Sequence, residues 1–462
     1  MQPKMDYQSG WNDFFRSRLD QIIDMKHPLA ILAGKIDWEW LHEKCRNHYA
    51  GIGRPGNSIR RMLGLLILKH MENLSDETLC ERWIENPYYQ FFCGEEFFQH
   101  RFPIERSSLS HFRSRIDEAT LESLLSESLR VANDTGAIRL KDTEKVAIDT
   151  TVQEKNIAFP TDSRLRYKAI VGLGKVAKLD GIDLRQSYIR VAKQQLIKSQ
   201  RYRHAKQFGR AKRAEKKLKT YLGRIIRDIY RKTGDNAVSE RMKAALAKAN
   251  KIHRQERTDK IKLFSWHAPE VECIPLRSFG ASADAVGKGK PHKPWEFGCK
   301  VSIATNVNPA PGGNFIFHAK ALHGKPYDGH TLKTAIENIT KIIGREPSRN
   351  YVDKGYTGHD YDNPNRVFKS GQKRGVFGKI KKELRRRTVV EPVIGHAKHD
   401  HRMNRNYLHG HHGDRLNPIL ASIGFNFHQL KRWLRDILFF LWNDLLQLLR
   451  ASFPEKIMQR TF

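Results

Sequence analysis

The chain has 462 residues, with 83 Lys or Arg against 50 Asp or Glu and a formal net charge of +33, which points to a polyanionic partner, above all nucleic acid. The longest apolar run, Ile437 to Trp442, is far shorter than the roughly 20 residues that span a bilayer, so no membrane partner is expected. The N-terminus lacks an apolar signal-peptide core and the five cysteines include no CxxC pair, which predicts reduced thiols and a cytoplasmic location.

Residues 1 to about 140 are expected to form an all-α N-terminal domain. Ser75 is a typical helix N-cap, with two acids in the following turn. After an aromatic, turn-rich stretch, a further helix is predicted to begin at Ser107–Ser108, with Arg113 and Arg115 facing outward. Two helices joined by a turn, with arginines on the second, resemble a helix-turn-helix DNA reader. The residues alone favour an ordinary helical bundle with a solvated basic face.

Near residue 145 the helical period changes to alternation. Val146 and Ile148 point one way, which predicts a short strand that ends at Asp149. A carboxylate at a strand end is a candidate catalytic group. The same residue could instead cap the turn before Thr150, and this segment alone does not separate the two interpretations.

A basic helical insertion is expected at about residues 163–258. Between Lys198 and Lys232 there are fourteen Lys or Arg against two acids. Apolar residues recur every three or four positions, which predicts an amphipathic helix that ends near Gly234; they are Leu218, Leu222, Ile225 and Ile229. At this density of positive charge, contact with phosphates is a better interpretation than a merely solvated face.

The second half of the chain alternates strands and helices. A β-hairpin is predicted from residues 297–303 and 315–321, then an amphipathic helix from Asp328 to Gly344, and then a short strand that ends at Asp353. A late helix carries Glu391. Because proline restricts the residue before it, Pro392 places Glu391 in the first turn of that helix.

Cations surround this late helix. Lys398, Arg402 and Arg405 are expected to share its face with Glu391, while Arg387 approaches from a preceding strand or loop. A C-terminal helical segment follows at about residues 415–462. Its apolar stripe predicts core packing in a final helix pair; the residues are Ile419, Ile423, Phe427, Leu430, Leu434, Ile437 and Leu441.

The order of these elements predicts an α/β, ribonuclease H-like catalytic domain over residues 141–462. In that fold, parallel neighbouring strands bring Asp149 and Asp353 together, and the late helix adds Glu391. Three carboxylates suit Mg²⁺ or Mn²⁺, and two such ions could activate a nucleophile and stabilise a leaving oxygen in phosphoryl transfer. Zinc is not predicted, because the histidines at 396–412 do not combine with cysteines into a tetrahedral set.

Short motifs across most of the chain are similar to those of one family. They include Gly53-Arg54-Pro55, Leu74-Ser75-Asp76, Cys80 to Trp83, Asn86 to Gly94, Asp149-Thr150-Thr151, Phe159 to Asp162, Ser265 to Ile274, Asp353-Lys354-Gly355-Tyr356, Glu391 to Lys398 and His401 to Leu408. In this order they resemble the DDE transposases of bacterial insertion sequences, and the IS5 family in particular. A related signature of Tyr, Arg, Glu and Lys is matched by Arg387, Glu391 and Lys398, but Leu384 stands at the Tyr position.

The resemblance implies that Asp149, Asp353 and Glu391 are the catalytic, metal-binding triad, and that the N-terminal helices bind the terminal inverted repeats of the element. Partners would be double-stranded DNA, both element ends and target, and further copies of the chain in a dimer or higher oligomer. The expected DNA-binding side chains are Lys354, Tyr356, Arg387, Lys398, Arg402 and Arg405, with Arg113 and Arg115 in the N-terminal domain.

Two other functions fit the sequence. A transposase-derived DNA-binding regulator without catalysis would also need the positive charge, although three carboxylates among cations give a pure binder no advantage. A ribonuclease H-like DNA nuclease would use the same acids but would not join cut ends to a second duplex.

Overall fold

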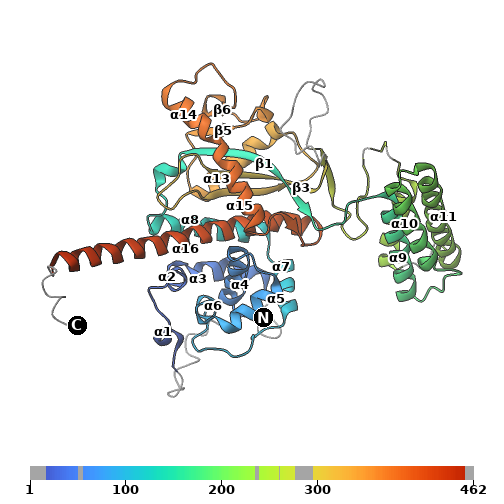
Figure 1. Cartoon of the computed structure of the whole chain (residues 1–462), viewed down its shortest axis with the longest axis horizontal. Coiled ribbons are helices and arrows are strands. Elements are labelled where there is room, and N and C mark those ends of the chain that lie inside the picture. The colour runs from blue at the N-terminus through green and yellow to red at the C-terminus, as the bar shows by residue number, and fades with distance from the viewer. Residues whose placement is uncertain are drawn as a thin grey trace. The chain divides into compact units, whose positions relative to one another are not determined.

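The structure is a computed structural model that describes residues 17–49, 56–234, 239–256, 258–259, 261–275 and 295–452, with side chains described as far as residue 438. The motif at 53–55 and the side chain of Leu441 lie outside this part. The chain forms two compact units (Figure 1): unit 1 is Met1–Glu154, Cys299–Leu408 and His412–Phe462, and unit 2 is Lys155–Gly298 with His409–His411. The N-terminal helices therefore share a compact unit with the sheet, and the functional boundary near residue 140 stays a prediction. No helix in the described part combines the length and the apolar character that a bilayer crossing needs.

Short helices form the N-terminal part of unit 1. They are α1 (Leu19–Ile22), α2 (Pro28–Lys35), α3 (Trp38–Cys45), α4 (Ile59–Met71), α5 (Asp76–Glu85), α6 (Pro87–Phe92), α7 (Arg106–Arg115) and α8 (Glu118–Asp134). As predicted, Ser75 caps α5, and its Oγ accepts the Thr78 N–H at 3.0 Å. Helix α7 begins one residue before the predicted serine pair.

Two expectations for this region are wrong. Helix α6 stands between α5 and α7, so these two helices are not joined by a simple turn. Arg113 does not face outward: it is 7% exposed, and its guanidinium donates to both carboxylate oxygens of Asp76 at 3.1 and 2.7 Å. The first-turn acid of α5 holds this arginine inward by a bidentate ion pair. Arg115 is exposed, as expected.

A mixed sheet forms the centre of unit 1. Its strands are β1 (Lys145–Lys155), β3 (Trp295–Asn306), β4 (Ile316–Leu322), β5 (Arg349–Val352), β6 (Val367–Lys369) and β7 (Arg405–Asn406). The order β3-β1-β5-β6 has β4 beside β3 and β7 beside β1; β5 is parallel to β1 and to β6, while β3 and β4 are antiparallel. The predicted hairpin is confirmed. Strand β1 runs six residues past Asp149, so the expectation that this strand ends at Asp149 is wrong.

The remaining elements of unit 1 follow the hairpin. They are the 3₁₀ turn η3 (Asp328–Thr331), α13 (Leu332–Ile343), η4 (Lys354–Tyr356), α14 (Gly378–Arg386), η6 (Arg387–Val389), α15 (Val390–His399) and α16 (Gly410–Ser452), with short 3₁₀ turns at Arg46–His48, Leu140–Thr143 and Pro364–Arg366. Gly344 ends α13 with a φ of 81°, as predicted. Glu391 lies in the first turn of α15, also as predicted.

Helix α15 is shorter than expected. It ends at His399, and the chain then turns through Arg402, whose φ is 68°, before Arg405 enters strand β7. The prediction that Arg402 and Arg405 share a helical face with Glu391 is therefore wrong, because a residue in the left-handed backbone conformation cannot continue a right-handed α-helix. Lys398, seven positions after Glu391, remains on α15.

A single long helix, α16, packs through unit 1 where the sequence predicted a helix pair. Figure 1 shows it between the N-terminal helices and the sheet. The predicted apolar stripe is buried from Ile419 to Leu434, which confirms core packing there. At Gly424 the helix approaches α4 so closely that a Cβ would lie 2.5 Å from the backbone carbon of His70.

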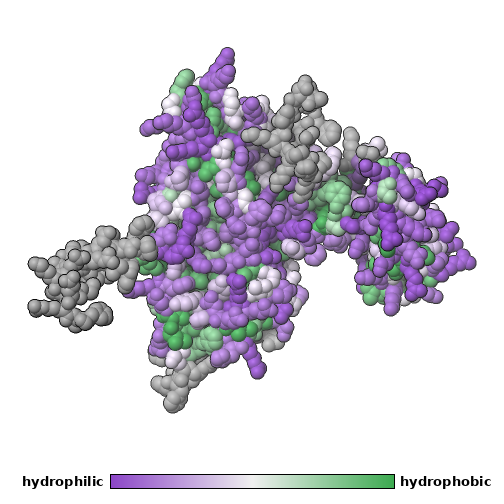
Figure 2. Space-filling model, viewed as in Figure 1, coloured by the Kyte–Doolittle hydropathy of each residue, from purple (hydrophilic) through white to green (hydrophobic). Residues whose placement is uncertain are grey.

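Unit 2 is built on four helices, α9 (Asp162–Leu179), α10 (Ile189–His204), α11 (Phe208–Thr233) and α12 (Glu240–Arg254), with strand β2 (Glu272–Pro275) paired to the first residues of β3. Its own apolar core includes the predicted α11 stripe, which is Leu218, Leu222, Ile225 and Ile229. Gly234 caps α11, as predicted. In Figure 2 the surface over these helices is mostly hydrophilic, which reflects the concentration of Lys and Arg outside that core.

Candidate acidic active site

Two predicted acids occupy matching positions on neighbouring parallel strands. In the register of β1 and β5, Ala147 pairs with Tyr351, so Asp149 and Asp353 each lie two residues further along. Burial raises the pKa of Asp149, and the negative charge of Asp353 adds to this rise. The structure thus brings these two residues together, as the sequence predicted.

Arg387 connects the third acid to this pair. Its Nη1 lies 3.3 Å from Asp149 Oδ2, and its Nη2 lies 3.6 Å from Glu391 Oε1. Arg387 stands in η6, directly before α15, so it approaches from a 3₁₀ turn where a strand or loop was expected. It is 9% exposed, whereas the Glu391 side chain is 63% exposed. The buried guanidinium of Arg387 therefore links the partly buried carboxylate of Asp149 to the exposed carboxylate of Glu391.

A fourth carboxylate, Asp328, belongs to the same cluster and was missed as a site residue in the sequence. Its Oδ1 accepts a hydrogen bond from Thr150 Oγ1 at 2.7 Å and lies 2.6 Å from Lys300 Nζ. A Cβ built on Gly355 would lie 3.2 Å from Asp328 Oδ2 and 3.6 Å from Asp353 Oδ1, so the two acids flank this glycine. In the sequence, Asp328 has the position of a residue that begins a helix. Lys300, a cation in a mostly apolar strand, indicates that a buried acid is needed nearby as its partner.

Burial and repulsion by neighbouring acids set the protonation of Asp149. Burial, with the charges of Asp353 and Asp328, raises the pKa of Asp149 to about 6, while Arg387 and the Thr150 N–H lower it. At neutral pH, Asp149 is still largely ionised. The Asp353 carboxylate accepts the Gly355 N–H at 2.5 Å.

Tyr356 lies beneath these acids. Burial, followed by the charges of Asp328, Asp149 and Asp353, raises the pKa of its phenol well above the ordinary value. The ring is only 1% exposed. The expectation of a DNA-binding side chain at this position is therefore not met by the structure, because its neighbours already enclose the ring.

The other predicted DNA-binding residues of unit 1 differ in their surroundings. Lys354 and Arg405 are exposed, and Lys398 is half-buried. Arg402 donates to the Asn73 carbonyl oxygen at 3.3 Å, and its guanidinium lies 5.9 Å from the centre of the Tyr407 ring. Leu384, at the signature Tyr position, packs half-buried against the apolar cluster that includes Tyr351 and Phe368.

The four acids fit a hard divalent cation in their chemistry, because Mg²⁺ prefers carboxylate oxygens. As the side chains stand, Asp149, Asp353 and Glu391 do not form a group whose oxygens all lie within 4.8 Å of one another. The exposed Glu391 side chain has the freedom to close this spacing.

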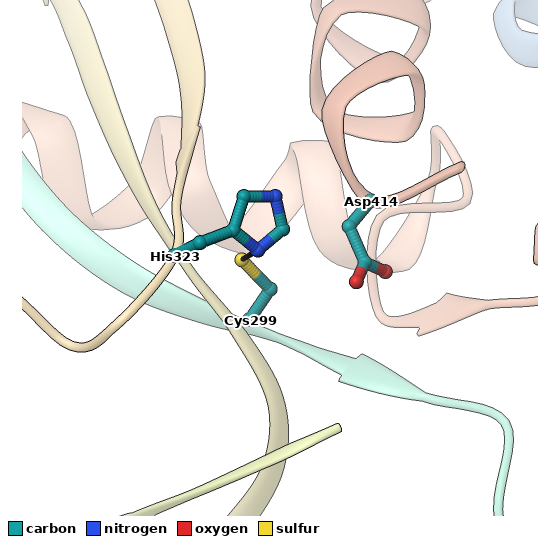
Figure 3. Close-up of side chains that lie close together, drawn as sticks. All are labelled: Cys299, His323 and Asp414. Carbon is teal, nitrogen blue, oxygen red and sulfur yellow. Dashed lines mark hydrogen bonds between the residues drawn. The ribbon is translucent and has the colours of Figure 1, made fainter. Parts of the chain in front are cut away.

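Among the described residues, Cys299, His323 and Asp414 do place possible ligand atoms within 4.8 Å of one another (Figure 3). Cys299 Sγ and His323 Nδ1 are 3.6 Å apart, and the Asp414 carboxylate accepts a hydrogen bond from Asn406 Nδ2 at 2.7 Å. All three residues make further polar contacts. This grouping shares no residue with the acidic cluster.

Comparison with known proteins places the chain in a family. Residues 17–115 match the family described as a transposase domain (DUF772). The chain is also similar to the "Uncharacterized protein ORF8 in nfe locus" of Rhizobium meliloti, with 52% identity over 200 residues, which is 43% of this chain and 97% of the rhizobial protein. No solved structure matches the chain. The chain therefore belongs to a transposase-like family that includes this rhizobial protein and carries the DUF772 transposase domain.

Proposed function

We propose that the chain is a DDE transposase of the IS5 type, which cuts the ends of its own element and joins them to target DNA. The observation that carries this proposal is the pairing of Asp149 on β1 with Asp353 after the parallel strand β5, with Glu391 tied to Asp149 through Arg387. The strand order β4-β3-β1-β5-β6 supports a ribonuclease H-like fold for the catalytic part.

The cofactor in this proposal is Mg²⁺ or Mn²⁺. Asp149, Asp353 and Glu391 would hold it, with Asp328 beside them. When bound, the ion would supply Lewis-acid stabilisation of charge on the phosphoryl oxygens and a lowered pKa for the attacking water.

The chain's own residues hold the reacting groups. Arg387 keeps the Asp149 and Glu391 carboxylates oriented, and the exposed cations Lys354 and Arg405 contact the DNA backbone. Water attacks the phosphorus at the element end, the P–O3′ bond breaks, and a 3′-OH is released. That hydroxyl oxygen then attacks a phosphorus of target DNA, and the target strand's own 3′ oxygen leaves.

End cleavage and strand transfer on duplexes that carry the flanking repeats test the proposal. Substitutions Asp353→Ala and Glu391→Ala should abolish Mg²⁺-dependent cleavage and leave DNA binding intact. Asp362→Ala is a matched control, since this acid forms an exposed ion pair with Lys333 at 2.9 Å and is not part of the cluster.

Three results would contradict parts of the proposal. Unchanged cleavage in both triad variants would remove these residues from catalysis. Cleavage without joining would indicate a nuclease. Repeat binding with no cleavage by the wild-type chain, in Mg²⁺ or in Mn²⁺, would favour a DNA-binding regulator.

A further inference from the structure

Unit 2 contains a cationic pocket of about 410 Å³. None of the residues of the acidic cluster lines it. It is lined by Arg185, Gln186, Tyr188, Arg224, Arg227, Asp228 and Arg231. Four arginines and a single acid thus line the cavity. One wall comes from the segment before α10, and the other comes from the last two turns of α11 and the turn before them.

The carboxylate of Asp228 is already engaged by the protein. It accepts the Arg185 N–H at 2.9 Å and lies 3.5 Å from Arg231 Nη2 and from Lys232 Nζ. Asp228 therefore anchors one wall of the pocket to the other. One acid shared in this way cannot neutralise four arginines, so the pocket keeps a positive potential.

An aromatic element shapes the same pocket. Tyr188 has a φ of 55°, an unusual conformation for a residue with a large side chain, and stacks on Tyr221 with ring centres 4.9 Å apart. Arg224 Nη1 donates to the Tyr188 hydroxyl at 3.4 Å. The stacked rings and this hydrogen bond fix the position of Arg224 at the cavity wall.

We infer that this arginine pocket binds a phosphate group of duplex DNA and makes unit 2 a second DNA-contacting part of the chain. A guanidinium group can donate two parallel hydrogen bonds to two oxygens of one phosphate. The negative charge of a phosphate also relieves the repulsion among four neighbouring arginines. A solvated basic surface needs neither a cavity nor a carboxylate that organises its walls. The inference rests on the proposed function only for the source of the phosphate, which is the element's DNA.

The test measures binding of the full chain to a labelled duplex over a range of NaCl concentrations, without divalent metal. In the double variant R224Q/R227Q, the slope of log K against log salt should fall by about 0.9, because the pocket holds one phosphate and each phosphate contact contributes about 0.9 to the slope. Affinity near 0.1 M salt should fall by about tenfold or more. The matched control is K212Q/K216Q, which removes two exposed cations of the same helix outside the pocket.

If the slope of log K against log salt falls equally in the two double variants, the pocket is not a specific phosphate site, and the basic surface of unit 2 binds DNA without one. Titration of the chain with inorganic pyrophosphate separates the two sources of phosphate: pyrophosphate binding that the R224Q/R227Q variant loses, with DNA binding unchanged, would overturn the DNA assignment. Thermal melting checks that both variants are folded. This binding test does not measure cleavage. A wild-type chain that fails to cut DNA would therefore contradict the proposed function without contradicting this inference.

Discussion

The guanidinium of Arg387 lies 3.3 Å from the carboxylate of Asp149 and ties the helical segment that carries Glu391 to the central strand of the sheet. The contact matters because the three acids come from distant parts of the chain. Two are brought together by backbone pairing between β1 and β5. The third is linked to Asp149 by this side chain, and Val390 beside it packs in one apolar cluster with Ala147 of β1. One cation therefore supplies the charge contact between Asp149 and Glu391.

Removal of this cation should uncouple the acids. In Arg387→Ala, Asp149 loses a charge that lowers its pKa, and Glu391 loses its link to the sheet. We expect Mg²⁺-dependent cleavage to fall by about a hundredfold, comparable to the loss of a positioned charge in an active site. Arg385→Ala, two residues earlier and exposed, is the control. Similar activity in both variants would contradict the linking role.

The fourth acid should matter for activity as well. In Asp328→Asn, the ion pair with Lys300 is lost, whereas Thr150→Val removes only the hydrogen bond to Asp328. We expect cleavage to fall by about tenfold or more in the first variant and by about a few-fold in the second, because the first removes the negative charge that faces Lys300, whereas the second removes one hydrogen bond and leaves that charge in place. Single-turnover cleavage rates measure both. A larger loss in Thr150→Val than in Asp328→Asn would reverse this order and rule out a role through charge.

Local sequence patterns predicted the elements that carry the site, because caps and periodicity are local physics. Ser75, Gly234 and Gly344 end or begin helices as expected, and Pro392 places Glu391 in a first turn. The Asp149 and Asp353 pair was also predictable, since parallel strands align their side chains in register. These inferences need only a few neighbouring residues.

The errors come from contacts between distant segments. Arg113 has the position of an outward helical residue, but Asp76 holds it inward. Tyr356 lies three residues after Asp353 in the chain and is nevertheless buried. Asp328 joins the cluster through Thr150, which precedes it by 178 residues. Ion pairs and hydrogen bonds over such separations leave no periodic signal in one sequence.

The glycine between the two acids should not tolerate a side chain. In Gly355→Ala, the new Cβ would lie 3.2 Å from Asp328 Oδ2, so one of the carboxylates must shift. We expect a loss of cleavage of about tenfold with little change in stability, since misplacement of a catalytic group by a fraction of an ångström already slows reaction. Gly395→Ala on α15 is the control, because its Cβ would meet nothing within 4 Å. That variant should be more stable by about 0.5–1 kcal/mol, since glycine weakens a helix interior.

Helix α14 should depend on one buried acid. Glu383 is 6% exposed, lies 2.8 Å from Lys145 Nζ and 2.6 Å from Arg349 Nη1, and accepts a hydrogen bond from the Tyr351 hydroxyl. Glu383→Ala leaves these groups without their shared partner and should lower the free energy of unfolding by about 3 kcal/mol. Urea denaturation measures it. Asp362→Ala breaks an exposed pair and should leave the midpoint unchanged; equal midpoints for the two variants would show that the network contributes no stability.

Acid should weaken the junction between α4 and the chain that follows α15. His401 Nδ1 lies 2.8 Å from the His70 carbonyl oxygen, and His70 Nδ1 lies 3.3 Å from the His401 carbonyl oxygen. Burial lowers the pKa of His401 to about 4 and also lowers that of His70. Between pH 6.5 and 4 the unfolded chain binds more protons than the folded chain. Stability is therefore full above about pH 6.5 and falls as the pH drops towards 4.

The loss attributable to His401 should reach about 2 kcal/mol between pH 7 and pH 5, at about 1.4 kcal/mol for each pH unit below the unfolded pKa. Urea unfolding of the wild type and of His401→Gln at both pH values isolates this contribution, because carboxylates elsewhere titrate in both proteins. The variant should be less stable at pH 7 but should lose less stability on acidification. The ring centre of His428 on α16 lies 5.4 Å from that of His401, so His428→Gln serves as the second control. Parallel pH profiles for the wild type and His401→Gln would show that His401 is not the group that senses acid.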